Sequence, residues 1–401
     1  MNQQKTVGFF LKRVDCNDGV ASHCETLIRG LIANNWRVVM ITGPISYDST
    51  SIGRFETLKH LVEDWIIFDQ IHPLLPNLSY LFKIQEIIKR YEISLLHAHG
   101  YSMLLFCRIL CLFNHLNCVA TYHPSIHGDD SKALKAVVLN PKLRQYKFYL
   151  TAFSPKTFIA CSSDTVSFLN ESLGFPKSKI SKILLGIDTK YFRPPTPEER
   201  QKARERFGLQ QNDTACMLVG RLNWNKGHDI LIEAARQART ELPDTNLKCL
   251  FAGSGAQENQ IKEYALVSEA DKHCFVFLGY TDDLREVYWA ADIFVLPSRS
   301  EGFALVVAEA MCCGVVPVRT PGGGAKDQIE DGINGFVVPF DDSETLARRL
   351  KLLSSDVEFR EQLSLEAQKT ARQKFTADQM VESTIAVYEE ILNPAKSSLM
   401  Q

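Results

Sequence analysis

Two cations stand in a glycine-flanked loop in the second half of the chain. Arg221 and Lys226 follow the apolar run 215–219, with Gly220 before the first cation and Gly227 after the second. Glycine lets the backbone approach a ligand closely, and charge-assisted hydrogen bonds to a phosphate or diphosphate contribute about 1.5–3 kcal/mol each. The pattern therefore favours an anion site over two ordinary surface charges.

Two glutamates lie on either side of a predicted helix start. A glycine directly after Glu301 indicates that this residue lies in a loop, whereas Glu309 lies inside the helix among apolar residues. A carboxylate in so apolar a helix is expected to be paired or functional. The two glutamates would then contact different parts of a long ligand, and the helix-start amides of Phe303, Ala304 and Leu305 would favour its anionic part.

A glycine turn and three histidines mark the first half of the chain. Gly19 follows the apolar run 7–11 and opens a predicted helix, which suits a ligand anion or hydroxyl but equally an ordinary turn. His97 and His99 alternate along a strand end and so face one side, and His123 follows another strand. No His-Glu-x-x-His motif or cysteine pair accompanies them, so we predict hydrogen-bonding or structural histidines and no metal site.

These residues must be positioned by short apolar runs that alternate with helical patterns along the chain. The predicted strands are 7–11, 37–42, 93–97, 117–122, 157–161 and 180–185, followed by 215–219, 247–252, 274–278, 293–296 and 315–319. The predicted helices include 20–33, 257–270 and 305–313. Such alternation with fully apolar strands is typical of parallel sheets covered by helices on both faces.

A proline-rich stretch at 186–197 separates the two series of strands. We therefore predict an α/β fold of two Rossmann-like, doubly wound parallel-sheet domains that face a cleft. The first domain would span 1–190 and the second 191–375, and a final helix at 376–392 would pack back on the first. Ligands of such sheets bind beyond the carboxyl ends of the strands, where the residues named above fall.

Composition argues against several classes of protein. With 45 Lys and Arg against 47 Asp and Glu, the formal net charge is -2, and the missing basic excess argues against a nucleic-acid partner. No run reaches the roughly 18–20 apolar residues of a membrane span, no signal-peptide pattern opens the sequence, and the 11 cysteines form no Cys-x-x-Cys pair. We therefore predict a cytoplasmic protein with reduced thiols.

Peripheral contact with the inner face of a membrane stays open. Basic and apolar residues interleave over 132–147 as in an interfacial helix, although an ordinary solvated helix fits this pattern as well. The basic residues are Lys132, Lys135, Lys142, Arg144 and Lys147.

Taken together, these motifs resemble the retaining nucleotide-sugar glycosyltransferases of family four, which have the two-Rossmann GT-B fold. The resemblance covers nearly the whole chain. It rests on Val219-Gly220-Arg221 with Lys226-Gly227, on Glu301-Gly302-Phe303 and Glu309-Ala310-Met311, on Asp331-Gly332-Ile333-Asn334-Gly335-Phe336, and on the segment from Leu185-Gly186-Ile187-Asp188 to Phe192-Arg193-Pro194. The chain departs from the family pattern at Asp18, Leu185 and Asp327, where glycine, asparagine and glutamate are usual.

The resemblance implies a role for each candidate residue. Arg221 and Lys226 would bind the donor diphosphate, Glu301 would bind hydroxyls of the transferred sugar, and His123 would lie near the sugar and the acceptor. These four are the predicted catalytic residues. The predicted donor-binding residues are Gly19, Gly220, Phe303, Ala304, Leu305 and Glu309, of which the last would hold the ribose.

The predicted function is transfer of a hexose or related sugar, with retention, from a UDP- or GDP-linked donor to a hydroxyl of a glycan, lipid or small molecule. Cell-envelope or glycolipid biosynthesis is the expected setting. No Asp-x-Asp motif occurs in the sequence, so Arg221, Lys226 and helix-end amides would stabilise the departing diphosphate without a metal or other cofactor.

Other functions on similar folds are a nucleotide-sugar epimerase, a glycan phosphorylase and a non-catalytic carbohydrate-binding protein. A nicotinamide dehydrogenase is disfavoured, because Gly253-Ser-Gly255-Ala-Gln-Glu258 lacks the third glycine of the dinucleotide motif.

Overall fold

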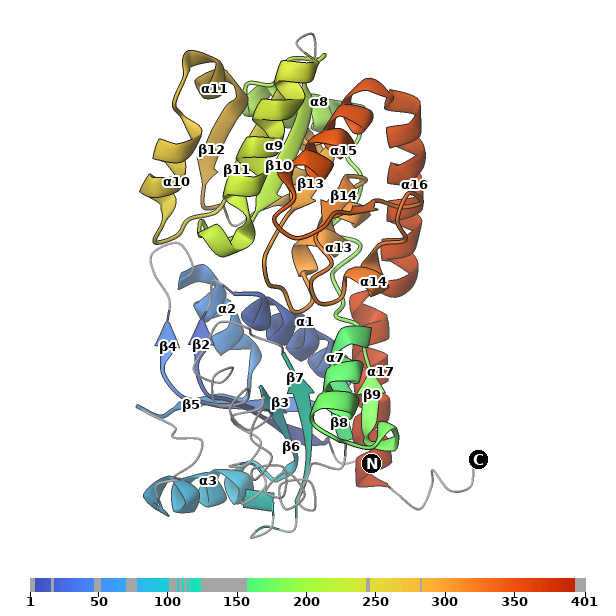
Figure 1. Cartoon of the computed structure of the whole chain (residues 1–401). Helices are drawn as coiled ribbons and strands as arrows, with labels where there is room; N and C mark the ends of the chain where they lie inside the picture. Colours follow the sequence, from blue (N-terminus) through green and yellow to red (C-terminus); the bar gives the residue numbers. More distant parts are fainter. Residues whose placement is uncertain are drawn as a thin grey trace. The chain divides into compact units, whose positions relative to one another are not determined.

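The computed structural model describes residues 4–15, 18–46, 52–69, 78–100, 107, 110, 111, 114, 116–123, 157–242, 246–281 and 283–393. It divides into two compact units (Figure 1): the first unit comprises residues 1–186 and 377–401, and the second unit residues 187–376. The observed division thus falls slightly before the expected boundary at residue 190. The basic segment 132–147 lies outside the described residues.

The first unit is built on a parallel sheet whose seven described strands lie in the order β5-β3-β1-β6-β7-β8-β9. From β1 the chain adds β3 and β5 on one side of the sheet and then β6 to β9 on the other side. The order in which strands are added therefore reverses between β1 and β6. The strands are β1 (Thr6–Leu11), β3 (Arg37–Thr42), β5 (Asp64–Ile67), β6 (Ile93–His99), β7 (Asn117–Tyr122), β8 (Thr157–Ala160) and β9 (Ile180–Lys182). A separate pair is formed by β2 (Val14–Asp15) and β4 (Ile45–Ser46).

Helices cover both faces of this sheet. Along β1, Phe9 belongs to the apolar cluster that includes α1 and α17, whereas Phe10 belongs to the cluster that includes α3. Successive strand residues point to opposite faces, and this alternation explains the two cores. The described helices of the unit are α1 (Gly19–Ala33), α2 (Ile52–Leu61), α3 (Leu78–Arg90), α7 (Ser163–Ser167) and α17 (Ala377–Leu392), with a π-helical turn at Phe168–Ser172 and a 3-10 turn at Lys177–Lys179.

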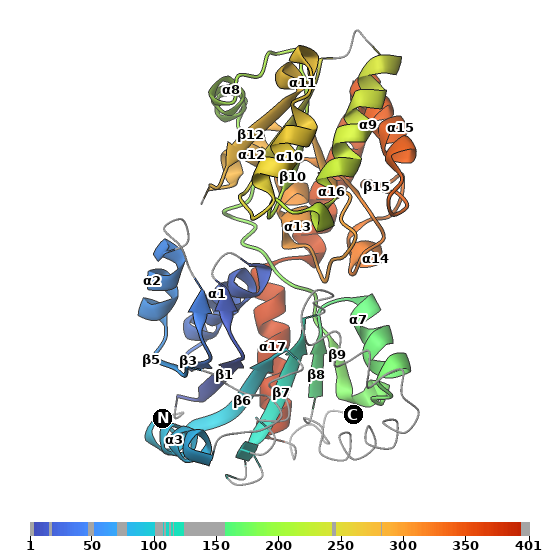
Figure 2. The same ribbon diagram turned by 60° about the vertical axis from the view of Figure 1, so that its left-hand side comes forward.

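Helix α17 belongs to the first unit although it follows the second unit in the chain, and Figure 2 shows it beside α1 and β6. The contact with α1 is close: a Cβ atom added to Gly30 would lie 2.2 Å from Cγ2 of Val381. Nearby, Tyr388 packs edge-on against Trp36, and its hydroxyl lies 2.5 Å from Nδ1 of His97 in β6. The helix is therefore held by apolar packing and by polar contacts, among them the buried one between Tyr388 and His97.

The second unit repeats the same plan. Its six described strands are parallel and lie in the order β12-β11-β10-β13-β14-β15. The order in which strands are added to the sheet therefore reverses between β10 and β13. The strands are β10 (Thr214–Val219), β11 (Leu247–Ala252), β12 (Phe275–Gly279), β13 (Ile293–Leu296), β14 (Val316–Arg319) and β15 (Phe336–Val337). The structure thus confirms an α/β fold with two doubly wound parallel sheets.

The helices of the second unit correct one prediction. The helix expected over 257–270 is two helices, because the side chain of Ser268 accepts a hydrogen bond from the amide of Asp271 and starts a new helix there. The described helices are α8 (Pro197–Arg206), α9 (His228–Glu241), α10 (Glu258–Ala265), α11 (Glu269–Cys274), α12 (Arg285–Ala290), α13 (Leu305–Cys312), α14 (Ala325–Gln328), α15 (Ser343–Ser355) and α16 (Val357–Lys374), with a 3-10 turn at Trp224–Lys226.

Within the described parts of the chain, none of the helices has the length and apolar character needed to cross a lipid bilayer.

The contact between α1 and α17 makes a stability prediction. In Gly30→Ala the new methyl group would collide with Val381, and overpacking of about 1–3 kcal/mol should exceed the helix-propensity gain of about 1 kcal/mol. We expect urea denaturation to show a free energy of unfolding lowered by about 1–2 kcal/mol. The matched control is Gly53→Ala in α2, where a Cβ meets nothing within 4 Å, and which should be neutral or stabilising. Equal behaviour of the two variants would contradict the close contact.

Candidate active site

The candidate residues of the second unit lie where the order of strand addition reverses, between β10 and β13. Strands β10 and β13 are neighbours in the sheet, and the loops 220–227 and 297–304 leave from their carboxyl ends. In open α/β sheets, ligands bind outside the carboxyl ends of the strands at such a reversal. The topology therefore brings the two loops that the sequence singled out to one edge of one sheet.

The loop after β10 rests directly on the chain after β13. The side chain of Asn223 accepts a hydrogen bond from the amide of Lys226 at 3.2 Å and closes a single 3-10 turn. The next residue, Gly227, has φ 74°, and a Cβ there would lie 2.1 Å from the carbonyl oxygen of Pro297. Only glycine fits this contact. The amide of Arg299 donates to the carbonyl of Asn225 at 2.9 Å and joins the two loops a second time.

This contact sets the position of Lys226. Its ammonium nitrogen lies 2.7 Å from Oε1 of Glu301, and the two side chains are only 23% and 10% exposed. The aliphatic part of the Lys226 side chain lies next to Gly220, where a Cβ would lie 3.6 Å from the Cδ of Lys226. The sequence assigned the two charged groups to different parts of a ligand, and the structure joins them in one ion pair.

Arg221 is placed differently. It directly follows Gly220 at the end of β10, and its side chain is exposed. Its carbonyl accepts a hydrogen bond from the amide of Asn223 at 2.8 Å, which fixes the backbone of this residue.

Glu309 is paired inside its apolar helix. The hydroxyl of Tyr288, a fully buried residue of α12, donates to Oε2 of Glu309 at 2.7 Å. Burial and the neighbouring carboxylate raise the pKa of Tyr288 well above its ordinary value, which keeps the phenol protonated as a donor. The sequence did not indicate Tyr288, because nothing in a short apolar helix shows which distant carboxylate one residue will face.

The start of α13 carries no side-chain cap. The helix begins at Leu305, as expected, with Ala304 as its capping residue and no acidic residue in its first turn. Uncapped amides at a helix start favour an anion. The side chains of the three predicted donor residues there, Phe303, Ala304 and Leu305, are nevertheless buried. Only their backbone could therefore serve a ligand.

A buried arginine supports this helix start, and sequence reasoning did not identify it. Arg319 ends β14 with no exposed surface, and its guanidinium donates to the carbonyls of Gly322 and Gly323, each at 3.2 Å, and also to the side chain of Gln328. The amide of Gln328 in turn donates to the carbonyl of Ala304 at 2.9 Å. Arg319 therefore fixes the glycine loop and the start of α13 together.

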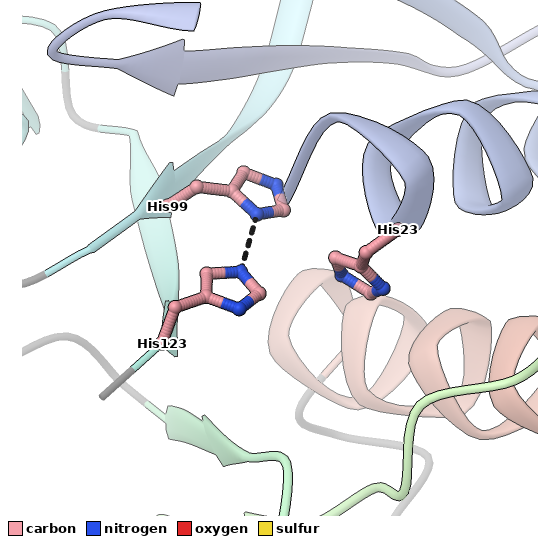
Figure 3. A group of neighbouring side chains, drawn as sticks. All are labelled: His23, His99 and His123. Atoms are coloured by element: carbon pink, nitrogen blue, oxygen red, sulfur yellow. Dashed lines mark hydrogen bonds between the residues drawn. The ribbon is translucent and has the colours of Figure 1, made fainter. Parts of the chain in front are cut away.

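Histidines of the first unit lie at the corresponding point of its sheet, where the order of strand addition reverses between β1 and β6. His99 ends β6, His123 directly follows β7, and His23 lies on α1; one ring nitrogen of each lies within 4.8 Å of the others (Figure 3). Nδ1 of His99 lies 3.3 Å from Nε2 of His123. His97 also packs against His99, but its ring nitrogens are engaged by Thr121 and Tyr388. The structure confirms that His97 and His99 face one side and that His123 lies near them, and it adds His23, which the sequence did not indicate.

Burial keeps these histidines neutral at neutral pH. Desolvation lowers the pKa of His123 to about 4 and that of His97 to about 3. The pKa values of His23 and His99 are also well below the ordinary value, because burial is reinforced by the neighbouring imidazoles. Each neutral ring carries a lone pair on one of its two nitrogens. His23 had no sequence signal, because a single histidine on an amphipathic helix is typical of a core position.

The turn at Gly19 differs from a simple anion site. Helix α1 begins at Gly19, and the carboxylate of Asp18 already accepts a hydrogen bond from the amide of Ala21 at 2.9 Å. A Cβ at Gly19 would meet nothing within 4 Å, so packing does not require glycine there. The open space permits close approach of a ligand, but Asp18 places a negative charge at this helix start.

Comparison with known proteins gives the family. The model of the group 1 glycosyl transferases matches residues 199–370, and that of glycosyltransferase family 4 matches residues 17–191. An uncharacterized glycosyltransferase of Methanocaldococcus jannaschii is 27% identical over 92% of this chain and 94% of its own length.

Solved structures agree on the fold. A glycosyltransferase from Rickettsia africae has a TM-score of 0.79 at 20% identity and covers 97% of this chain and 99% of its own. HepE of Anabaena, solved in complex with UDP, has a TM-score of 0.76 at 20% identity and covers 96% of this chain and 99% of its own. HepE has also been solved with UDP-glucose. The chain therefore belongs to the family 4-like glycosyltransferases and has their two-domain GT-B fold.

Proposed function

We propose that this glycosyltransferase moves a sugar from a nucleoside diphosphate sugar to a hydroxyl of a glycan, lipid or small molecule, with retention of the anomeric configuration. The observation that carries the proposal is the ion pair of Lys226 with Glu301 at the carboxyl end of β10, close in the chain to the uncapped start of α13. An ammonium group has three donors, so Lys226 can keep Glu301 and still bind a phosphate oxygen.

The roles that we propose for the site residues are those that the family resemblance implies. Lys226 and Arg221 would bind the diphosphate, and Glu301, oriented by Lys226, would accept hydrogen bonds from sugar hydroxyls. Glu309, held by Tyr288, would bind the ribose. Backbone groups at Gly220 and at the start of α13 would complete the donor site. His123 would contact the sugar or the acceptor, and Gly19 would leave room for either.

The reaction would proceed on one face of the sugar. The acceptor oxygen attacks the anomeric carbon while the bond from that carbon to the diphosphate oxygen breaks, and the departing phosphate oxygen takes the acceptor's proton. Charge accumulates on the diphosphate, and fixed cations and amides aimed at that position stabilise it most strongly in the transition state. We propose that this stabilisation replaces a metal ion.

UDP is the first nucleotide to test, because the fold neighbour HepE was solved with UDP and with UDP-glucose. GDP is the second. We further propose a cytoplasmic enzyme of cell-envelope or glycolipid biosynthesis. Nothing favours the epimerase, phosphorylase or non-catalytic functions. Gly255, which resembles a glycine of the dinucleotide-binding motif, is instead required by packing, because a Cβ at this position would lie 2.4 Å from the carbonyl oxygen of Leu222.

Donor binding can be measured directly. A panel of nucleotide sugars should include one that raises the thermal unfolding temperature by several degrees, because a ligand at 100 times its Kd stabilises by about 2.7 kcal/mol. In Glu309→Gln the shift should shrink strongly, since the ribose loses a charged acceptor. Glu366→Gln, at an exposed position of α16, is the control and should behave like the unaltered protein. A panel without any stabilising nucleotide sugar would contradict the proposal.

Removal of the cations should slow the chemical step. We expect Arg221→Ala and Lys226→Ala each to lower kcat by about 10²–10³, the effect of deleting one preorganised donor to a developing anion. Lys369→Ala removes an exposed cation of α16 in the same unit and should leave kcat unchanged. Circular dichroism would verify folding. Unchanged turnover in both site variants would reject these roles.

The same electrostatic argument predicts that EDTA does not lower the transfer rate. The unaltered enzyme should turn over equally with and without chelator, at matched ionic strength. Loss of activity with EDTA, restored by a divalent ion, would show that a metal and not these side chains stabilises the diphosphate.

Retention is tested on the product. With an α-linked donor, proton NMR of the isolated product should show an α-glycosidic bond. A β-linked product would establish inversion and exclude attack on the face of the departing group.

A further inference from the structure

The histidine cluster of the first unit contains polar atoms without partners. Within the described residues, both ring nitrogens of His23 and Nε2 of His99 are buried and make no hydrogen bond. His23 is only 3% exposed and His99 5%. A buried donor or acceptor without a partner costs about 1–3 kcal/mol, so several such atoms in one place indicate a missing ligand.

The arrangement of the rings suits a metal ion. His23, His99 and His123 come from three different elements, α1, the end of β6 and the residue after β7, and their rings converge (Figure 3). Each offers one nitrogen, and these nitrogens lie within 4.8 Å of one another. Three nitrogens around a tetrahedral zinc ion at 2.0–2.1 Å would be about 3.3 Å apart, so ring movements of about 1 Å would close the site.

The surroundings select the kind of ion. Imidazole nitrogens suit zinc and its neighbours rather than magnesium or calcium. The converging group consists of the three histidines, and Cys24, whose sulfur lies 3.8 Å from Nδ1 of His99, is not part of it. The fourth position of a tetrahedral ion is therefore left open. A solvent molecule would take that position.

We propose that His23, His99 and His123 form a three-histidine site for a zinc ion. His97 does not belong to it, because Thr121 and Tyr388 already engage both of its nitrogens. Instead, the ring of His97 packs against that of His99, with 4.1 Å between the two centroids, and so helps to hold His99 in position. The proposed zinc site includes none of the diphosphate-binding residues named above.

Calorimetry with zinc chloride on the full chain tests the site. The unaltered protein, freed of metal with a chelator, should bind one zinc ion that His23→Phe does not bind, or binds at least about tenfold more weakly, since even outer-shell changes cost 10–100-fold in affinity. Replacement of the unpartnered imidazole by an apolar ring should leave the fold intact. His60→Ala is the matched control, because His60 lies on α2 of the same unit with an 82% exposed side chain.

The cysteines make the comparison between variants essential, since thiols also bind zinc. One equivalent lost in His23→Phe but kept in His60→Ala supports the site. Identical zinc binding in all three proteins overturns it, and the unpartnered nitrogens would then be assigned to ordered water.

A second readout rests on the proposed function. A zinc ion on His123 would withdraw this residue from the sugar, so micromolar zinc should inhibit transfer by the unaltered enzyme and by His60→Ala but much less by His23→Phe. The calorimetric result stands independently: a protein without transferase activity would contradict the proposed function and leave the metal site intact.

Discussion

The contact between the backbone of Gly227 and the carbonyl of Pro297 is the constraint on which the candidate site depends. A Cβ at this glycine would lie 2.1 Å from that oxygen, so the loops after β10 and β13 can meet only with glycine here. Because they meet, an ammonium group from one strand end lies 2.7 Å from a carboxylate of the other. The ion pair is thus a consequence of backbone packing and does not cause it.

Each charged group named below, in or beside the candidate site, has a compensating partner. Lys226 neutralises Glu301, Tyr288 donates to Glu309, and carbonyl oxygens surround the guanidinium of Arg319. A buried charge is tolerated only when it is paired or hydrogen-bonded in this way. Since Arg319 keeps its positive charge behind the glycine loop, it adds to the field of the helix start and favours an anion on the far side of that loop.

The first unit uses the same topology for a different chemistry. Its reversal between β1 and β6 also gathers side chains from strand ends and from the following helix, but these side chains are imidazoles rather than charged groups. They are buried, and desolvation makes their protonation costly. Two sheets with one winding order therefore present a charged site in the second unit and a neutral, nitrogen-rich cluster in the first.

The sequence by itself determined the fold class, the strand-helix alternation, and the loops that carry Arg221, Lys226 and Glu301, because apolar periodicity and glycine placement are local properties. It also placed Glu301 before its helix and Glu309 within it. Only the tertiary structure decided that Lys226 pairs with Glu301, that Tyr288 and Arg319 support the site, and that His23 joins His99 and His123. Contacts between residues far apart in the chain depend on how the elements pack in three dimensions, and a local sequence pattern does not predict them.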